Sequence, residues 1–278
     1  MTVEVMTTQL ATEDLDALRR AVRALEGGSF ASRLANAVGR QVQTVGRALP
    51  SAARKLVAAA SEKALNAALR VATRTIDQKA PPRAEIGLHK TMAAASGAAG
   101  GAFGLAALAI ELPVSTAIMM RSIAQIARAE GEDLRQPETA LACLEVFALG
   151  GSNSGEAVLE GEYFAIRGAL AKTVSDSARF IVNGGLATET APILVRLVAQ
   201  VAARFGVVVS EKLAAQAIPV IGAVGGAAVN LAFADHFQAM ARGHFTVRRL
   251  ERQYGEEAVR FEYDRLRHEL AQRRRLDA

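Results

Sequence analysis

The chain has 278 residues and a formal net charge of +5, with 51% hydrophobic residues, 5% aromatic residues and no tryptophan. Its single cysteine, Cys143, excludes an internal disulfide framework and is typical of a reducing compartment. Alanine is the main apolar residue, and runs of β-branched and aromatic residues are nearly absent, which favours helix over strand. We therefore expect an all-α protein folded as a compact multi-helix bundle.

The N-terminal sequence MTVEVMTTQLATEDLD lacks both the basic start and the apolar core of a secretory signal, so we expect a cytoplasmic protein. A first helix is predicted from Thr12, as its N-terminal cap, to Gly27 and Gly28, which end it. Its apolar positions follow at helical spacing: Leu15, Leu18, Val22 and Leu25.

Residues 1–82 are predicted to form a basic N-terminal helical region with an interruption near Pro50. Four arginines in this region recur every seven residues and so share one helix face: Arg33, Arg40, Arg47 and Arg54. Such a face is either simply solvated or the basic side of an amphipathic helix on anionic lipid, where each basic residue adds about 1 kcal/mol. No aromatic residues are interleaved with the arginines, so nucleic acid is not an expected partner.

The Ala80–Pro82 segment separates this region from residues 83–278, which are predicted to form a helical domain with a charged C-terminal helix. Two stretches in the domain, Thr91–Ile110 and Leu213–Ala234, carry no charged side chain and consist largely of alanine and glycine. We expect them to be two central Gly/Ala-rich helices. Glycines at GxxxG and neighbouring spacings would let their backbones approach closely or face lipid: Gly97, Gly100, Gly101, Gly104, Gly222, Gly225 and Gly226.

Each uncharged stretch is long enough to cross a bilayer. The large apolar residues of Thr91–Ile110 favour insertion by only about 1.5–3 kcal/mol in total, and Pro219 interrupts the second stretch. Close-packed soluble helices, reversible contact with lipid and a permanent span are the three alternatives. The small insertion energy favours close packing, with conditional exposure to a bilayer.

Prolines and glycines delimit the other predicted helices. Glu111-Leu112-Pro113 is expected to end the first uncharged stretch, so that Pro113 begins a new helix. The predicted helices are Val114–Glu130 with Gly131 as its C-cap, Pro137 to Gly150, Glu156–Lys172, Ser175–Val182, Pro192–Ser210, and a charged helix from Arg242 with an apolar stripe of Leu250, Tyr254, Phe261, Leu266 and Leu270.

Isolated polar residues among apolar ones are the candidate site. Glu111 either stabilises the N-terminus of the following helix or belongs to a buried polar site. Arg121, the sole charge between Val114 and Ala127, either pairs with an acid or contacts a phosphate or lipid headgroup. Asn230 needs buried partners. An enzyme would require a pocket in which five residues converge: Glu111, Arg121, Asn230, Asp235 and His236.

The motifs of common catalytic and metal sites are missing. His236 and His244 are eight residues apart, about 12 Å along one helix, which is too far for one metal ion. The glycine-rich segment GGSNSG (150–155) is neither a phosphate-binding P-loop nor a GxSxG nucleophile elbow. Cys143 lies among apolar residues and is interpreted as a core residue. We expect no metal ion and no cofactor.

Several ordered motifs resemble the EcsC family. Glu111-Leu112-Pro113, the segment RSIAQIA (121–127) and EGE (130–132) resemble its acidic-Leu-Pro and R-x-I-x-x-I-A segments. YFAIR (163–167) and IPVIGAVGGAAVN (218–230) resemble its second half, and Ala241 and Phe245 continue the pattern. The resemblance covers about residues 84–255, and Glu111 occupies a position where the family more often has aspartate.

The resemblance implies a bacterial, α-helical, membrane-associated protein and carries over no catalytic residue. The family takes its name from a gene encoded beside an ABC-type exporter. We therefore expect a non-enzymatic helical protein at the cytoplasmic face of the inner membrane, which binds an anionic membrane surface, lipid or a membrane partner through its Gly/Ala-rich helices. The alternatives are a hydrolase acting on a lipid or peptide, and an accessory protein of an ABC-type exporter.

Overall fold

The computed structural model describes residues 10–28, 30–31, 50–76, 105–151, 162–183, 191–216 and 222–276. Over these ranges the regular secondary structure consists of eight helices and includes no strand, so the all-α prediction is confirmed. The helices are α1 (Thr12–Leu25), α3 (Ser51–Ile76), α5 (Leu105–Ala129), α6 (Pro137–Leu149), α7 (Glu162–Val182), α8 (Pro192–Gln216), α9 (Gly222–Tyr254) and α10 (Glu256–Leu276).

Several predicted helix boundaries are confirmed. Helix α1 ends just before Gly27, α3 begins directly after Pro50, and α6 runs from Pro137 to Leu149 with Gly150 as its C-cap. Gly131, after α5, has a φ of +81°, which is the left-handed conformation expected of a glycine C-cap. The cap of α1 was predicted wrongly, because Ala11 occupies that position and Thr12 is the first helical residue.

The predicted break at Pro113 is also wrong, because α5 continues through this proline. A proline inside a helix removes the hydrogen bond to the carbonyl four residues earlier, here that of Ala109. Packing compensates for this loss, since Leu108 and Leu112 on the inner side of α5 are 2% and 0% exposed. Of the first uncharged stretch, residues 91–104 lie outside the described part of the chain.

The second uncharged stretch does not form one central helix. Its first residues end α8 at Gln216, and its last residues begin α9 at Gly222. The predicted C-terminal helix is likewise divided, because Gly255 has a φ of +88° and separates α9 from α10. Phe261 was placed on the apolar stripe of this helix, but its side chain is 63% exposed.

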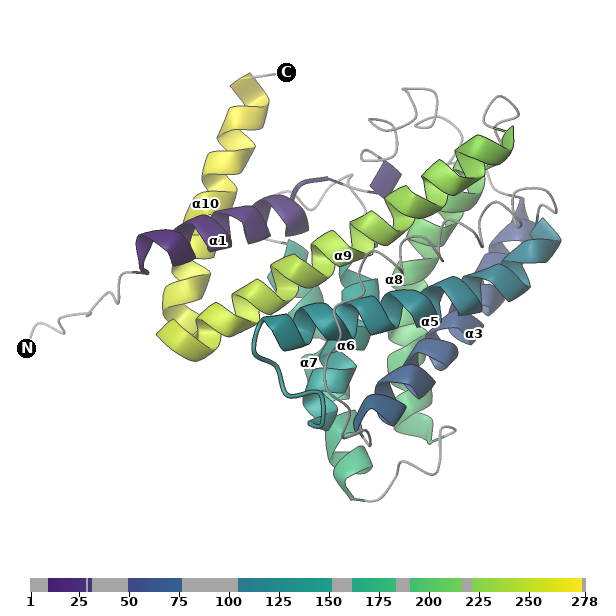
Figure 1. Cartoon of the computed structure of the whole chain (residues 1–278), viewed down its shortest axis with the longest axis horizontal. Helices are drawn as coiled ribbons and strands as arrows, with labels where there is room; N and C mark the ends of the chain where they lie inside the picture. The colour runs from purple at the N-terminus through teal and green to yellow at the C-terminus, as the bar shows by residue number, and fades with distance from the viewer. Residues whose placement is uncertain are drawn as a thin grey trace, which may run out of the picture.

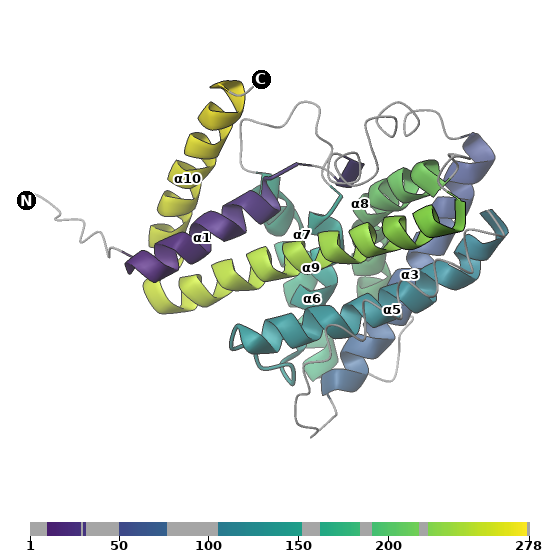
Figure 2. The same ribbon diagram turned by 45° about the horizontal axis from the view of Figure 1, so that its top comes forward.

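Two long helices, α5 and α9, lie side by side on one face of the molecule in both ribbon views (Figure 1 and Figure 2). Helix α3 packs against α5, and α6, α7 and α8 lie behind the pair. Helix α6 is the centre of the core, because all of its residues except Glu138 are buried. Helices α1 and α10 pack at the C-terminal end of α9.

The described helices of residues 1–82 pack into the same core as the rest of the chain. Leu18 and Val22 of α1 and Leu65 of α3 belong to the buried apolar cluster that includes α6 and α9. The N-terminal region therefore contributes directly to the core of residues 83–278 in the part that the structure describes.

Among the described helices, one segment is long and apolar enough to cross a membrane by length and composition alone. This segment, Pro192–Ala215 in α8, has a mean hydropathy of 1.8, and 44% of its most apolar window is buried inside the protein. A core helix satisfies the same criterion, and α8 packs against α3, α6, α7 and α9. The segment is therefore weak evidence for a membrane span.

Two glycines provide a matched test of close packing. A Cβ atom on Gly151 would lie 2.2 Å from the carbonyl oxygen of Arg204, which is backbone and cannot move aside, whereas a Cβ on Gly168 would meet nothing within 4 Å. We expect Gly151→Ala to lower the free energy of unfolding by about 1–3 kcal/mol. Gly168→Ala should raise it by up to about 1 kcal/mol, because alanine is the better helix former. Urea unfolding followed by circular dichroism measures both, and equal effects would contradict the packing of α6 against α8.

Candidate functional site

A buried ion pair joins three helices at one end of the α5–α9 pair. Lys212 of α8 donates a hydrogen bond from Nζ to Oε1 of Glu111 on α5, at 2.8 Å. Asn230 of α9 donates to the same oxygen from Nδ2, at 3.1 Å. The Lys212 side chain is 1% exposed and that of Glu111 is 7% exposed. We call these three residues the polar triad.

The surroundings of Lys212 make its charge dependent on Glu111. The Nζ atom lies 4.8 Å from the centre of the Phe233 ring, an arrangement in which the ring face attracts the cation. Burial lowers the pKa of the Lys212 ammonium, and the charge of Glu111 and its hydrogen bond oppose this effect. Since an unpaired buried charge costs several kcal/mol, each member of the pair requires the other.

The structure brings two of the five predicted site residues together, Glu111 and Asn230. Arg121 and Asp235 are exposed. Arg121 lies ten residues beyond Glu111, about 15 Å along the same helix. His236 is buried, and its Nε2 atom is 3.0 Å from the carbonyl oxygen of Gly150 at the end of α6. The triad, the exposed pair and His236 are thus separate features.

The other predicted functional residues are placed only in part. Arg33, Arg40 and Arg47, and with them Gly97, Gly100, Gly101 and Gly104, lie outside the described residues. Arg54 is exposed on α3. Gly222, Gly225 and Gly226 lie in the first turns of α9, where their role in helix packing or lipid contact stays a prediction.

Helices α5 and α9 run in the same direction and are joined by polar contacts along their length. After Glu111 and Asn230, Gln238 of α9 donates to the hydroxyl of Ser122 at 3.0 Å. Further on, the hydroxyl of Thr246 donates to Glu130 at 3.2 Å. Because the residue numbers increase together on both helices, the pair is parallel.

This geometry defines an outer face of the pair. Two parallel right-handed helices meet here at Glu111 and Asn230. In this arrangement the residue before Glu111 on α5 and the residue after Asn230 on α9 point to the same side of the pair. Exposure agrees: Ile110 is 73% exposed and Leu231 is 37% exposed, whereas Leu112 and Val229 on the opposite side are 0% exposed. The outer face comprises Ile110, Val114 and Arg121 of α5 and Leu231, Asp235 and Arg242 of α9.

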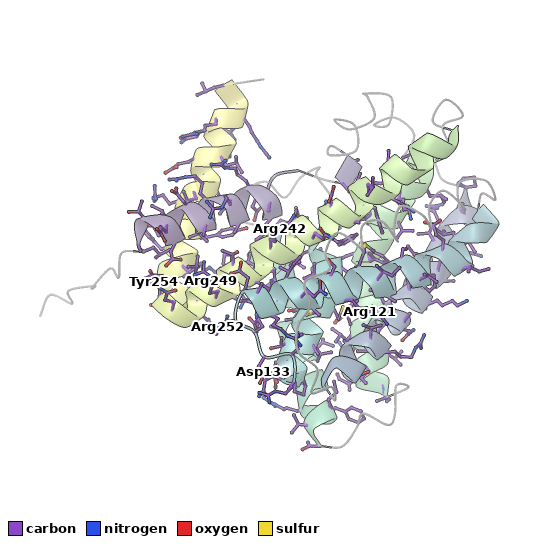
Figure 3. The ribbon with its side chains drawn as sticks, in the orientation of Figure 1. Arg121, Asp133, Arg242, Arg249, Arg252 and Tyr254 are labelled. Carbon is purple, nitrogen blue, oxygen red and sulfur yellow. The ribbon has the colours of Figure 1, made fainter. Side chains whose placement is uncertain are left out.

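The outer face is apolar at one end and carries arginines further along. Arg121 follows Ile110 by eleven residues, and Arg242 follows Leu231 by eleven residues. Eleven residues of α-helix return to within about 20° of the same direction and advance by about 16 Å. Each helix therefore presents an exposed apolar residue and an exposed arginine on one line (Figure 3 labels Arg121 and Arg242).

A second buried polar cluster lies between α6, α7 and α9. Arg167 donates to Glu251 at 2.7 Å and to the hydroxyl oxygen of Tyr163 at 3.5 Å. The Tyr163 hydroxyl also forms a hydrogen bond with Nδ1 of His244, at 3.0 Å. Burial, followed by the charges of Arg248 and Arg167, lowers the pKa of His244 well below its ordinary value, so the imidazole is neutral.

This second cluster includes Glu145 and borders Cys143. Burial raises the pKa of Glu145 to about 7, although Arg167 and Arg248 oppose the shift. Burial also raises the pKa of the Cys143 thiol, so the nucleophilic thiolate is scarce at neutral pH. Tyr163, His244 and Glu145 are 2%, 0% and 5% exposed, and a substrate would reach them only if the helices separated. We therefore assign this cluster a structural role.

An ion-pair network fastens the C-terminal half of α9 to α1 and to the end of α5 (Figure 3). Arg248 donates two hydrogen bonds to Glu132, at 2.8 and 3.1 Å, and Arg252 also pairs with Glu132. Arg249 bridges Glu130 and Asp14, at 2.9 Å each. The Tyr254 hydroxyl donates to Asp14 at 2.7 Å and, with Arg249, lowers the pKa of that carboxyl.

No group of three His, Cys, Asp or Glu residues that could hold a metal ion is found among the described residues.

Sequence reasoning missed Lys212, because it directly precedes the second uncharged stretch and looks like its boundary. It also gave Glu145 and His244 no shared site. Lys212 did carry a signal, since it is a cation among the apolar residues at the end of α8, but its partner Glu111 is 101 positions away.

The polar triad can be tested by removing one charge and then both. We expect Lys212→Met to lower the free energy of unfolding by about 3–5 kcal/mol, because it leaves Glu111 buried without a cation. The double variant Lys212→Met/Glu111→Gln should recover part of this loss, since no buried charge remains. Chemical denaturation measures the cycle, with Lys55→Met on the exposed side of α3 as the control. Additive losses would argue against the pair.

The raised pKa of Glu145 predicts a pH dependence of stability. A carboxyl whose pKa rises from 4.5 to about 7 on folding binds more protons in the folded state between these values. The free energy of unfolding should therefore fall by about 3 kcal/mol as the pH rises from about 4.5 to 7. Glu145→Gln should lack this part of the slope.

The measurement is denaturation at pH 5 and pH 8, with exposed Glu62→Gln as the control. Glu211, whose pKa burial also raises to about 7, adds a slope of the same sign. His244 adds one of opposite sign, because its pKa is lowered. The contributions of Glu211 and His244 cancel when the free energy of unfolding of Glu145→Gln is subtracted from that of the unaltered protein. A difference that does not change with pH would contradict the shift.

The model of the EcsC protein family matches residues 12–250. This range includes most of residues 1–82. The resemblance described from the sequence motifs covers only about residues 84–255. No curated protein and no solved structure matches the chain significantly. Because the family model covers most of the 278 residues, the chain belongs to the EcsC protein family.

Proposed function

We propose that this protein binds an anionic membrane surface at its cytoplasmic side, through the outer face of α5 and α9, and acts there without catalysing a reaction. The observation that carries the proposal is the pairing of exposed Ile110, Val114 and Leu231 with Arg121 and Arg242 on that one face. Apolar side chains enter the boundary between headgroups and acyl chains, while arginines attract anionic headgroups.

Charge on the outer face also supports an anionic partner. Arg121 and Arg242 outnumber the one carboxylate of the face, Asp235, and Arg128 follows Arg121 on the same side of α5. Each arginine near an anionic membrane contributes about 1 kcal/mol, and salt screens this attraction over a Debye length of about 8–10 Å. Binding should therefore require anionic lipid and weaken as the salt concentration rises.

The polar triad explains why this face is built as it is. The pair Glu111–Lys212 with Asn230 holds the N-terminal ends of α5 and α9 together and turns their neighbours, Ile110 and Leu231, to the same side. The triad itself is buried, so its proposed role is to position the apolar residues. The hydrolase and the exporter-accessory alternatives gain no specific observation from the described residues.

The test is flotation of the purified chain with vesicles of phosphatidylglycerol and phosphatidylcholine. The unaltered protein should float with the anionic vesicles at low salt, and the variant Ile110→Glu/Val114→Glu should not. Both residues are exposed, so the variant should fold, as circular dichroism will check. Phe261→Glu replaces a residue that is 63% exposed on α10 and serves as the matched control. Absence of flotation by the unaltered protein, or equal loss in both variants, would rule the proposal out.

A further inference from the structure

A pocket of about 310 Å³ lies between α1 and α9, beside the end of α5. Gly243 marks the place where the two helices touch, because a Cβ there would lie 2.8 Å from Cγ of Leu25 and 3.2 Å from the carbonyl oxygen of Ala21. Next to this contact the lining side chains are small, Ala17 and Ala21 on α1 and Ala239 on α9. The short side chains leave the space that forms the pocket.

Three arginines line the pocket: Arg20 of α1 and Arg242 and Arg249 of α9 (Figure 3 labels the last two). One carboxylate, Glu130, lines it as well. Arg249 is occupied, because it pairs with Glu130 and with Asp14 at 2.9 Å each. The side chains of Arg20 and Arg242 are exposed and form no ion pair or hydrogen bond with another described residue.

The charges of the pocket therefore do not balance within the described chain. Arg249 is neutralised by Glu130 and Asp14, whereas the guanidinium groups of Arg20 and Arg242 pair with no carboxylate of the described residues and lie beside a concave space. Guanidinium groups bind phosphate oxygens with paired hydrogen bonds and keep their charge at any physiological pH. A volume of about 310 Å³ is at the lower end of ligand pockets, which suits a phosphate group and a small substituent.

We infer that this pocket binds a phosphate mono- or diester, with Arg20 and Arg242 as its ligands, Arg249 held beside them by Glu130, and the alanines against the apolar part of the ester. We call it the arginine pocket. Two sources share this chemistry, the headgroup of an anionic phospholipid and a free phosphate. The lipid source rests on the proposed function, because Arg242 lies on the outer face of α9 in line with Leu231.

The experiment measures phosphate binding and vesicle binding separately. Isothermal titration with inorganic phosphate should give saturable binding to the unaltered protein. Arg20→Gln and Arg242→Gln should each weaken it about tenfold, the loss expected for one charge-assisted hydrogen bond. Arg196→Gln, which replaces an exposed arginine on α8, should leave the affinity unchanged. Absence of saturable binding, or equal loss in all three variants, would overturn the site.

Flotation with phosphatidylglycerol vesicles then distinguishes the two sources. If the headgroup is the ligand, Arg20→Gln/Arg242→Gln should reduce flotation and free phosphate should compete with the vesicles. If phosphate binds but no vesicle floats, the pocket holds for a free phosphate and the proposed membrane function fails. If vesicles float and only Ile110→Glu/Val114→Glu reduces this, the membrane function holds and the headgroup site is overturned.

Discussion

An ammonium group without access to water is the constraint around which this bundle is arranged. Lys212 has no surface of its own, so its charge is stable only where an acid and a polar environment meet it inside the protein. Glu111 and Asn230 provide both, from two other helices. The three residues must coincide in space, which sets the relative position of α5, α8 and α9 along their axes. We infer that the triad fixes the register of these three apolar helices, whose apolar contacts alone would allow other positions along the helix axes.

This fixed register also determines which side chains are exposed next to the triad. Parallel helices in fixed register present the neighbours of a buried contact to one side, and here those neighbours are Ile110 and Leu231. The buried charge and the exposed apolar residues are therefore two results of the same geometry. Along the pair the polar contacts recur at Ser122 and Glu130, so the two helices stay in parallel contact from the apolar end of the face towards the arginines.

Small residues have a different role from the one their hydropathy suggests. At Gly151 and Gly243 two segments come so close that a methyl group on the glycine would collide with the neighbouring helix, α8 and α1 respectively. Small side chains also leave a pocket beside Gly243, because the alanines there are too short to fill the space between α1 and α9. Alanine and glycine thus produce both the tight contacts of the bundle and its arginine-lined pocket. Charge, supplied by the ion pairs of Arg249 and Arg248, holds the helices around that pocket.

The sequence by itself determined the helical class and several boundaries. Periodic apolar residues, Pro50, Pro137 and the paired glycines act within a turn or two, so α1, α3 and α6 could be located from local rules. The residues of EcsC motifs likewise indicated the family, and Glu111 and Asn230 stood out as isolated polar groups. Each of these signals is carried by neighbours along the chain.

Tertiary structure decided what depends on partners distant in sequence. Pro113 was expected to break α5, but the burial of Leu108 and Leu112 outweighs the lost hydrogen bond. The meaning of Lys212 depends on Glu111, 101 residues earlier, and the arginine pocket depends on α1 crossing α9. An ion pair and a concave surface are properties of distances between chain segments. Local sequence rules contain no such distances, which is why composition could suggest a membrane role but could not place the face that would serve it.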